Sequence, residues 1–177
     1  DKSAVANTSR LVLVTSTNAA SAKTGVTRGQ ATANATCFAR DLANTPPAHL
    51  TARMISDLAV AQAADAGLKV EVFNKDQLKQ MGCGGMIGVN KGSVEPPRMV
   101  RLTWKPKGAT GHVALVGKGV MYDSGGISLK PSDPSHAVMK MDMSGAAAVL
   151  ATMLSLKALN VKTAVTGYLM CTDNMPS

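Results

Sequence analysis

The sequence is poor in aromatic residues, and this scarcity limits how its core is filled. Phe, Trp and Tyr together make up 3% of the 177 residues, while hydrophobic residues as a whole reach 45%. Eleven methionines are present, and methionine adapts to irregular gaps between packed elements. We therefore predict a core of Ala, Val, Leu and Met, in one domain of ordinary size or one domain with part of another.

Cysteines are few and widely spaced, which argues against a disulfide framework or a zinc ribbon. Cys37, Cys83 and Cys171 form no CxxC pair, so the simplest interpretation is three free thiols in a reducing cytosol. No apolar run approaches the roughly 18 residues that a membrane helix needs, and no signal peptide is recognisable. These observations predict a cytoplasmic protein without a membrane segment.

Acidic residues are also scarce, and the formal net charge is +8. Such a charge suits a polyanionic partner, but the Lys and Arg residues form no block of five or more like charges. A nucleic-acid role is therefore a minor alternative. A simpler explanation is that the acidic partners of these bases lie on a part of the protein outside this chain.

Hydrophobic periodicity and turn residues divide the chain into alternating strands and helices. Strands are expected at residues 10–15, 68–73, 99–104, 112–116 and 161–171, with a brief one over 86–89 inside a loop at 82–92. Helices are expected at 26–42, 51–66, 75–81 and 145–159, with a polar linker at 16–24. This alternation predicts an α/β fold with a mostly parallel or mixed sheet, flanked by helices on both faces.

Residues 116–148 concentrate charged side chains within a glycine-rich, apolar stretch. Lys118 and Asp123 follow a predicted buried strand, Lys130 lies further along the loop, and Asp142 directly precedes a helix of small residues. Ligands of open α/β sheets bind beyond the carboxyl ends of strands, and carboxylates gathered there repel one another unless cations neutralise them. Each residue alone is explained by a cap, a turn or a solvated lysine, but together they indicate a metal or phosphate site.

The strings VGKGVMYDSGGISLK and MKMDMSGAAA resemble the leucyl aminopeptidase (cytosol aminopeptidase) family of dinuclear metallopeptidases. That family carries VGKG-x-x-x-DSGG-x-x-x-K, followed by M-x-x-D-M-x-GAA. RDLANTPP, GVNKGSVEPPR and CTDNMPS agree as well, so the resemblance spans about residues 25–177. It implies that residues 1–44 are the end of an N-terminal domain with its linker helix, and that residues 45–177 are the first part of the catalytic domain.

The resemblance also implies roles for five residues. Lys118 and Asp142 correspond to ligands of the second metal ion, and Asp123 corresponds to the carboxylate that bridges both ions. Lys130 corresponds to the lysine that polarises the scissile carbonyl of the substrate. Met139 corresponds to a methionine that lines the pocket for the first side chain of the substrate, with plain core packing as the competing explanation.

By resemblance, the whole protein removes leucine-like N-terminal residues from peptides through water that two divalent ions activate. Zinc or manganese is expected, magnesium or cobalt is compatible, and a bicarbonate ion and a homohexamer are implied. The second acidic motif of the family, NTDAEGR, does not occur in this sequence. We therefore expect the remaining segment on a separate chain and this chain alone to be inactive. The alternative is a DNA-binding or otherwise non-catalytic member of the same family.

Overall fold

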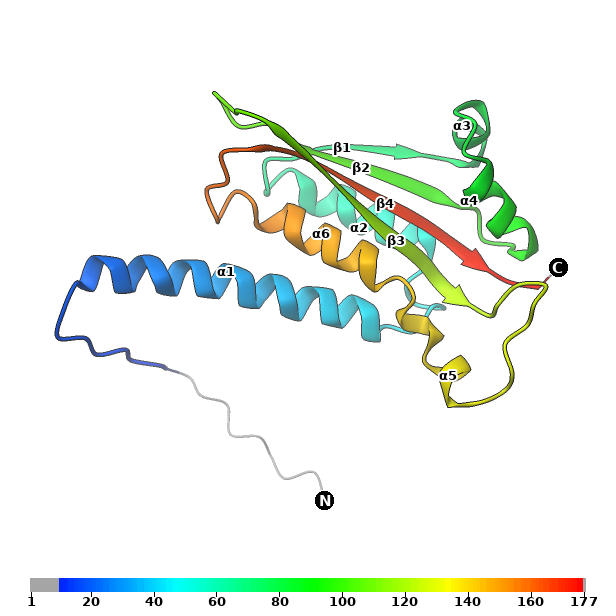
Figure 1. The fold of residues 1–177 in the computed structure, drawn as a ribbon, viewed down its shortest axis with the longest axis horizontal. Helices are drawn as coiled ribbons and strands as arrows, with labels where there is room; N and C mark the ends of the chain where they lie inside the picture. Colours follow the sequence, from blue (N-terminus) through cyan, green and yellow to red (C-terminus); the bar gives the residue numbers. More distant parts are fainter. Residues whose placement is uncertain (1–9, 177) are drawn as a thin grey trace, which may run out of the picture.

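A computed structural model describes residues 10–176, which form one mixed sheet with helices packed against it (Figure 1). The helices are α1 (Ala19–Asn44), α2 (Ala52–Ala63), α3 (Lys75–Gln80), α4 (Gly84–Val89), α5 (Pro134–Ala137) and α6 (Ser144–Ser155), with 3-10 turns η1 (Asn90–Gly92) and η2 (Met139–Met141). The strands are β1 (Lys69–Phe73), β2 (Arg98–Trp104), β3 (His112–Asp123) and β4 (Ala164–Asn174). In Figure 1, α1, α2 and α6 all lie on the same side of the sheet.

The sheet has the strand order β1-β2-β4-β3, and the predicted mixed α/β class is confirmed. β3 and β4 are parallel, but β1 pairs with β2 and β2 pairs with β4 in the antiparallel sense. The parallel pair is the one whose strands are joined by a long connection with the crossover helix α6, as parallel pairing requires. A largely parallel sheet with helices on both faces is therefore not what the described residues form.

The core lies between the sheet and its helices, and its composition is as predicted. α6 packs on β3 and β4, while α2 packs on β1 and β2. The fully buried large side chains include Ile55, Leu102, Met121, Met143, Leu150, Met153 and Leu169. Burial of one such side chain contributes roughly 1.5–3 kcal/mol. Aliphatic side chains and methionine thus fill the space that aromatic residues occupy in other proteins.

The first helix is longer than its apolar pattern predicts, and the expected polar linker at 16–24 is wrong. α1 already begins at Ala19 because the side chain of Asn18 accepts a hydrogen bond from the backbone N–H of Ser21 at 3.1 Å. The hydroxyl of Thr24 donates to the carbonyl oxygen of Ala20 at 3.1 Å. The Asn18 cap therefore starts the helix early, and the threonine hydroxyl finds its partner on the helix's own backbone at the exposed surface.

The predicted strand at 10–15 is also wrong, although its sequence is β-branched. The side chains of Leu11 and Val14 are 79% and 93% exposed, and the segment belongs to no strand. A strand forms only where a neighbour satisfies its backbone N–H and C=O groups. Within residues 10–176, no strand pairs with this segment.

The glycine-rich stretch at 82–92 forms short helices rather than a loop with a strand. α4 starts with a hydrogen bond from the N–H of Ile87 to the carbonyl oxygen of Cys83 at 3.2 Å, and η1 follows directly. The predictions near α2 are confirmed, because Thr51 caps it through a hydrogen bond from the N–H of Met54 and Gly67 adopts a φ of +69°. Glycine tolerates that left-handed conformation after a helix end.

One stretch passes a simple length and composition test for a membrane helix, namely residues 134–155. This stretch comprises α5, η2 and α6. Ala146, Ala147 and Leu150 of α6 are fully buried against the sheet. The apolar character of α6 is therefore explained by its packing in the core, and the signal is weak evidence for a membrane segment.

Candidate functional site

The site begins where α6 approaches the edge strand β3 more closely than side chains allow. A Cβ atom added to Gly117 would lie 2.5 Å from the carbonyl oxygen of Gly145, and one added to Gly145 would lie 2.9 Å from the N atom of Lys118. Glycine within a strand commonly marks such a close approach of backbone. This packing holds the turn before α6 directly against the middle of β3.

The close approach brings Lys118 and Asp142 together from separate parts of the sequence. Lys118 Nζ lies 2.7 Å from Asp142 Oδ2, where the lysine side chain is 60% exposed and the aspartate 22% exposed. Asp142 Oδ2 is buried and accepts no hydrogen bond of good geometry. The carboxylate is therefore neutralised by one amine alone, and its Oδ2 atom retains coordination capacity.

A second ion pair forms at the carboxyl end of β3, between Asp123 and Lys130. Lys130 Nζ donates to Asp123 Oδ2 and also to the Asp123 carbonyl oxygen, the latter at 3.1 Å. Asp123 Oδ1 accepts from the N–H of Gly125 at 2.9 Å and from Asn174 Nδ2 at 2.6 Å. Both side chains are mostly buried, with exposed fractions of 17% for Asp123 and 26% for Lys130.

The pKa of Asp123 reflects these contacts. Burial is the largest single influence and raises the pKa, because it disfavours the charged carboxylate. Hydrogen bonds from Lys130, the Gly125 N–H and Asn174, together with the charge of Lys130, outweigh burial and leave the pKa below its ordinary value. Asp123 is therefore a carboxylate held in its anionic form, as a metal ligand must be.

Asn174 is the site residue that sequence reasoning missed. It ends β4 beside Asp123, which ends β3, and the two strands are parallel neighbours. A signal was available, since polar side chains at the carboxyl ends of adjacent parallel strands meet at one edge of a sheet. The predicted strand ends at Cys171, three residues before the observed end of β4, and so does not reach Asn174.

Met139 is partly buried and lies on η2, which connects α5 to α6 along the chain and contacts β3. Its carbonyl oxygen accepts a hydrogen bond from the N–H of Asp142 at 3.2 Å. This bond ties the backbone of Met139 to the turn that carries Asp142. The role of Met139 in a side-chain pocket stays a prediction.

The residues of this chain fit part of a metal site. Two carboxylates and one amine suit a hard or borderline divalent cation. Among residues 10–176, no group of three His, Cys, Asp or Glu residues converges on one point. Asp142 Oδ2 and the anionic carboxylate of Asp123 would contribute to such a site only together with further ligands.

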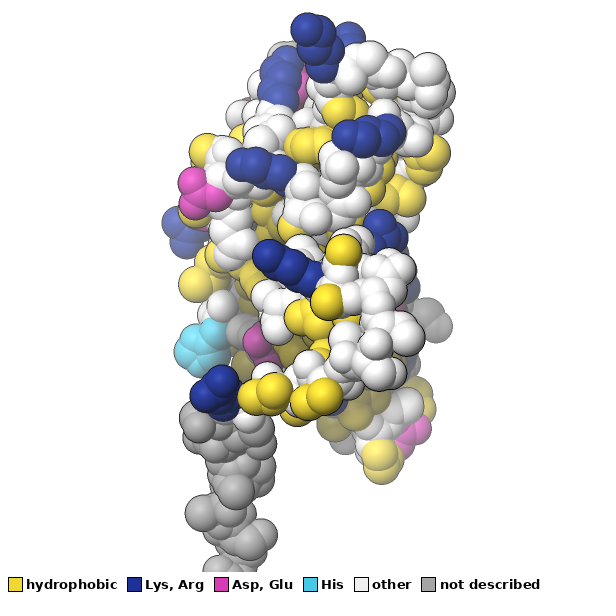
Figure 2. Space-filling view, turned by 90° about the vertical axis from the view of Figure 1, so that its left-hand side faces the viewer, with side chains coloured by type: hydrophobic (Ala, Val, Ile, Leu, Met, Phe, Trp, Pro, Cys, Tyr) yellow, Lys and Arg dark blue, Asp and Glu magenta, His cyan; other side chains and the backbone are white. Residues whose placement is uncertain are grey.

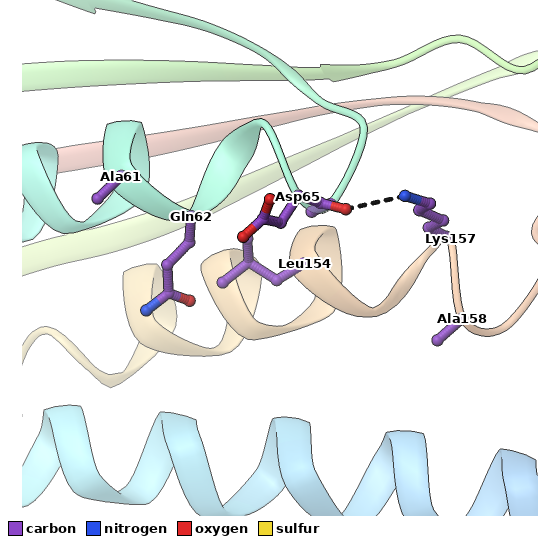
Figure 3. Close-up of a pocket in the computed structure, with 7 residues that line it drawn as sticks. Ala61, Gln62, Asp65, Leu154, Lys157 and Ala158 are labelled. Carbon is purple, nitrogen blue, oxygen red and sulfur yellow. Dashed lines mark hydrogen bonds between the residues drawn. The ribbon is translucent and has the colours of Figure 1, made fainter.

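Of two grooves on the molecule, one lies beside the ion pair of Asp123 and the other lies away from both ion pairs. One of about 300 Å³ adjoins Asp123, because Gly125 and Asn174 line it together with residues of α4 and η1. Another of about 610 Å³ lies between α2 and the end of α6, where Lys157 Nζ donates to the carbonyl oxygen of Asp65 at 2.9 Å (Figure 3). The second groove lies away from both ion pairs, whereas the first adjoins the candidate site.

Basic side chains do not gather into one stripe on the face seen in Figure 2. Lys and Arg side chains lie at separate places there, with uncharged and hydrophobic atoms between them. A nucleic-acid backbone is usually followed by a clustered basic stripe. The DNA-binding alternative therefore gains no support from this face.

Comparison with known proteins identifies the family. The catalytic domain of the cytosol aminopeptidase family (Peptidase_M17) matches residues 37–177. The chain belongs to this family, and the resemblance seen in its motifs is confirmed.

Relatives and solved structures agree with that assignment. The chain is 43% identical over 167 residues to a probable cytosol aminopeptidase of Micrococcus luteus, covering 94% of this chain and 32% of the relative. It is 48% identical over 139 residues to one of Chlorobaculum tepidum, covering 78% of this chain and 27% of the relative. It therefore spans about a third of the length of the curated relatives that it matches.

Two solved structures share the fold closely. The bottromycin maturation enzyme BotP in complex with Mn superposes with a TM-score of 0.83 at 45% identity, covering 88% of this chain and 33% of that one. The apo leucyl aminopeptidase of Trypanosoma cruzi gives a TM-score of 0.79 at 37% identity, covering 83% of this chain and 29% of that one. The described residues thus adopt the fold of this part of an aminopeptidase.

Proposed function

We propose that this chain supplies one wall of the active site of a metal-dependent aminopeptidase that releases leucine-like N-terminal residues. The supporting observation is the pair of lysine–aspartate contacts, Lys118 with Asp142 and Lys130 with Asp123. Family membership and the Mn complex of a relative support the same proposal. Peptides are the proposed substrates.

Lys118, Asp123 and Asp142 are the proposed ligands of divalent metal ions. Bound ions would supply a water of lowered pKa and would polarise the substrate carbonyl. Asp123 contributes an anionic carboxylate whose orientation is fixed by its neighbours. Lys118 ligates only as the neutral amine, so metal binding requires loss of its proton.

Lys130 is the proposed catalytic cation. Its amine is mostly buried and lies beside Asp123, where it would donate to the oxygen on which negative charge develops during attack on the carbonyl. Such preorganised donors are often the largest single contribution to catalysis. Met139 is proposed to line the pocket for the first side chain of the substrate.

The site needs partners from outside this chain. Asp123 and Asp142 are two carboxylates, and a pair of ions requires more ligands than these. We propose that the remaining segment of the same enzyme, on a separate chain, supplies the other ligands and holds any bicarbonate. A homohexamer in the cytoplasm, with two Zn or Mn ions per site, completes the proposal.

Hydrolysis of leucine p-nitroanilide tests the proposal. The enzyme, purified together with any companion chain, should be active with Mn²⁺ or Zn²⁺ and inactive after chelation. Asp123→Ala should lose nearly all of kcat, whereas the exposed control Asp57→Ala should not. Near-normal hydrolysis by Asp123→Ala would refute the role of that carboxylate. Intact-mass analysis that finds only the 177-residue species in an active sample would refute the need for a partner.

A further inference from the structure

We propose that Asn174 is a positioning residue that fixes the carboxylate of Asp123 in the orientation needed to bind metal. This inference rests on the proposed function, because it assumes that Asp123 is a metal ligand. It assigns a role to a side chain that touches neither the substrate nor the ions. Its basis is the geometry at the ends of β3 and β4.

An irregularity in the sheet places the two residues side by side. Along most of the pair, β3 and β4 advance together, with Val120 opposite Thr172. The register then shifts, so that Asp123 rather than Tyr122 stands opposite Asn174. An extra residue of this kind redirects the side chain that follows it, and bulges are common beside active sites. The shift therefore aims Asp123 at the side chain of Asn174.

Hydrogen bonds from Asn174 and Gly125 occupy one oxygen of the carboxylate. Asn174 Nδ2 lies 2.6 Å from Asp123 Oδ1, and the N–H of Gly125 lies 2.9 Å from the same atom. Asp123 Oδ2 faces the amine of Lys130 instead. Because different donors hold the two oxygens, the plane of the carboxylate is fixed. Oδ1 is occupied by the amide and the Gly125 N–H, and Oδ2 is turned toward the cationic side of the site, where the Lys130 amine stands.

Asn174 is itself held firmly, which a positioning residue requires. Its carbonyl oxygen accepts from the N–H of Ser124 at 3.0 Å and from Ser124 Oγ at 2.7 Å. A Cβ added to Gly126 would lie 2.5 Å from Asn174 Oδ1, so the loop leaves room for the amide because glycine stands there. The backbone bonds do not depend on the side chain of Asn174, so the amide can be replaced without breaking them.

Loss of the amide donor has a predictable effect. Partners that hydrogen-bond a ligating group orient it, and their removal typically lowers metal affinity or activity by about 10-fold to 100-fold. Without Asn174 Nδ2, only the Gly125 N–H restrains Asp123 Oδ1. The carboxylate then rotates more freely, and the geometry around a bound ion becomes less uniform.

The test measures Mn²⁺ binding to the enzyme, purified with its companion segment, by electron paramagnetic resonance of free and bound ion. Asn174→Leu removes the amide but keeps nearly the same side-chain volume. Asn174→Ala removes the amide and also most of the side-chain volume. The matched control is Asn34→Ala, an exposed asparagine of α1 that pairs with Gln30. Both Asn174 variants should bind Mn²⁺ about 10-fold to 100-fold more weakly, with a broadened spectrum of the bound ion. Their melting temperature should stay close to that of the wild type.

The outcomes separate this inference from the proposed function. A wild-type enzyme that neither binds Mn²⁺ nor hydrolyses leucine p-nitroanilide would refute the proposed function itself. If the wild-type enzyme binds Mn²⁺ and hydrolyses the substrate, but the Asn174 variants keep the same Mn²⁺ affinity and spectrum, only the role of Asn174 is overturned. Unfolding of both variants would also overturn it, because the residue would then be structural.

Discussion

Gly117 on β3 and Gly145 at the start of α6 are in backbone contact, and this contact determines where the first ion pair forms. A Cβ on Gly117 would lie 2.5 Å from the carbonyl oxygen of Gly145 and 2.7 Å from the Cα of Ala146. Both contacts are with backbone atoms, which cannot move aside as a flexible side chain can. The pairing of Lys118 with Asp142 depends on this absence of side chains.

Gly117→Ala should therefore separate α6 from β3. Overpacking of this kind typically reduces the free energy of unfolding by about 1–3 kcal/mol, and metal binding should weaken as Lys118 and Asp142 move apart. Gly29→Ala is the matched control, since an added Cβ meets nothing within 4 Å there. Because Gly29 lies within α1, alanine should stabilise that helix by about 0.8–1 kcal/mol. Thermal unfolding of the two variants measures the difference. Equal stability of Gly117→Ala and Gly29→Ala would contradict the packing argument.

Lys130→Met should abolish most activity while preserving the fold. The variant keeps the length of the side chain but removes the charge beside Asp123. Loss of one preorganised donor to a developing oxyanion typically reduces kcat by about 10²–10³. Lys79→Met is the control, because Lys79 also faces a carboxylate, Asp76 at 3.5 Å, but is 55% exposed and lies on α3. Steady-state kinetics should show a lower kcat for Lys130→Met but not for Lys79→Met. Similar kcat values for the two variants would count against the assignment of Lys130.

Cys171 should resist thiol reagents in the folded protein. The three cysteines are free thiols, as predicted, and burial raises the pKa of Cys171 to about 12. At pH 8, about one thiol in 10⁴ would be the reactive thiolate, even if a reagent reached it. Exposed Cys37 should react readily. Titration with Ellman's reagent, with peptide mapping, should detect Cys171 only in denaturant, and labelling of native Cys171 would show that β4 opens.

Asp173→Asn should stabilise the protein at neutral pH. Burial is the largest influence on the pKa of Asp173 and raises it, and the negative charge of Glu95 acts in the same direction. Hydrogen bonds from Ser93 Oγ at 2.8 Å and from the N–H of Tyr122 only partly oppose this rise. A carboxyl group whose pKa is raised on folding costs stability as the pH rises above its unfolded pKa, and the full cost is present above its folded pKa. That cost shrinks as the pH falls through the folded pKa, and it vanishes below the unfolded value of about 3.9.

The measurement is the melting temperature of wild type and variant between pH 3 and pH 8. Asparagine still accepts the hydrogen bond from Ser93, so the variant should melt higher at pH 7 and equally at the acid end. Asp57→Asn, an exposed position on α2, should show no such pH-dependent gain. A variant that is less stable at pH 7 would mean that the hydrogen bonds to the charged carboxylate, from Ser93 and the N–H of Tyr122, outweigh the cost of burying it.

Local sequence patterns predict the structure correctly where interactions between neighbouring residues determine it. Thr51 caps the second helix and Gly67 closes the turn that follows its last residue, Ala63, because a cap and a left-handed turn each depend on a few neighbouring atoms. The same patterns failed for residues 10–15 and 82–92. A β-branched run needs a partner strand, and the glycine-rich run has too few side chains to show a helical period.

The sequence by itself determined the kind of chemistry available and the family. The spacing of Lys118, Asp123, Lys130 and Asp142 within one motif is a property of the chain alone, as is a core without many aromatic residues. Tertiary structure decided which lysine meets which aspartate, the order and direction of the strands, and the contact between Asn174 and Asp123. These features depend on strand register and on the close packing of α6 against β3, which the local sequence pattern does not specify.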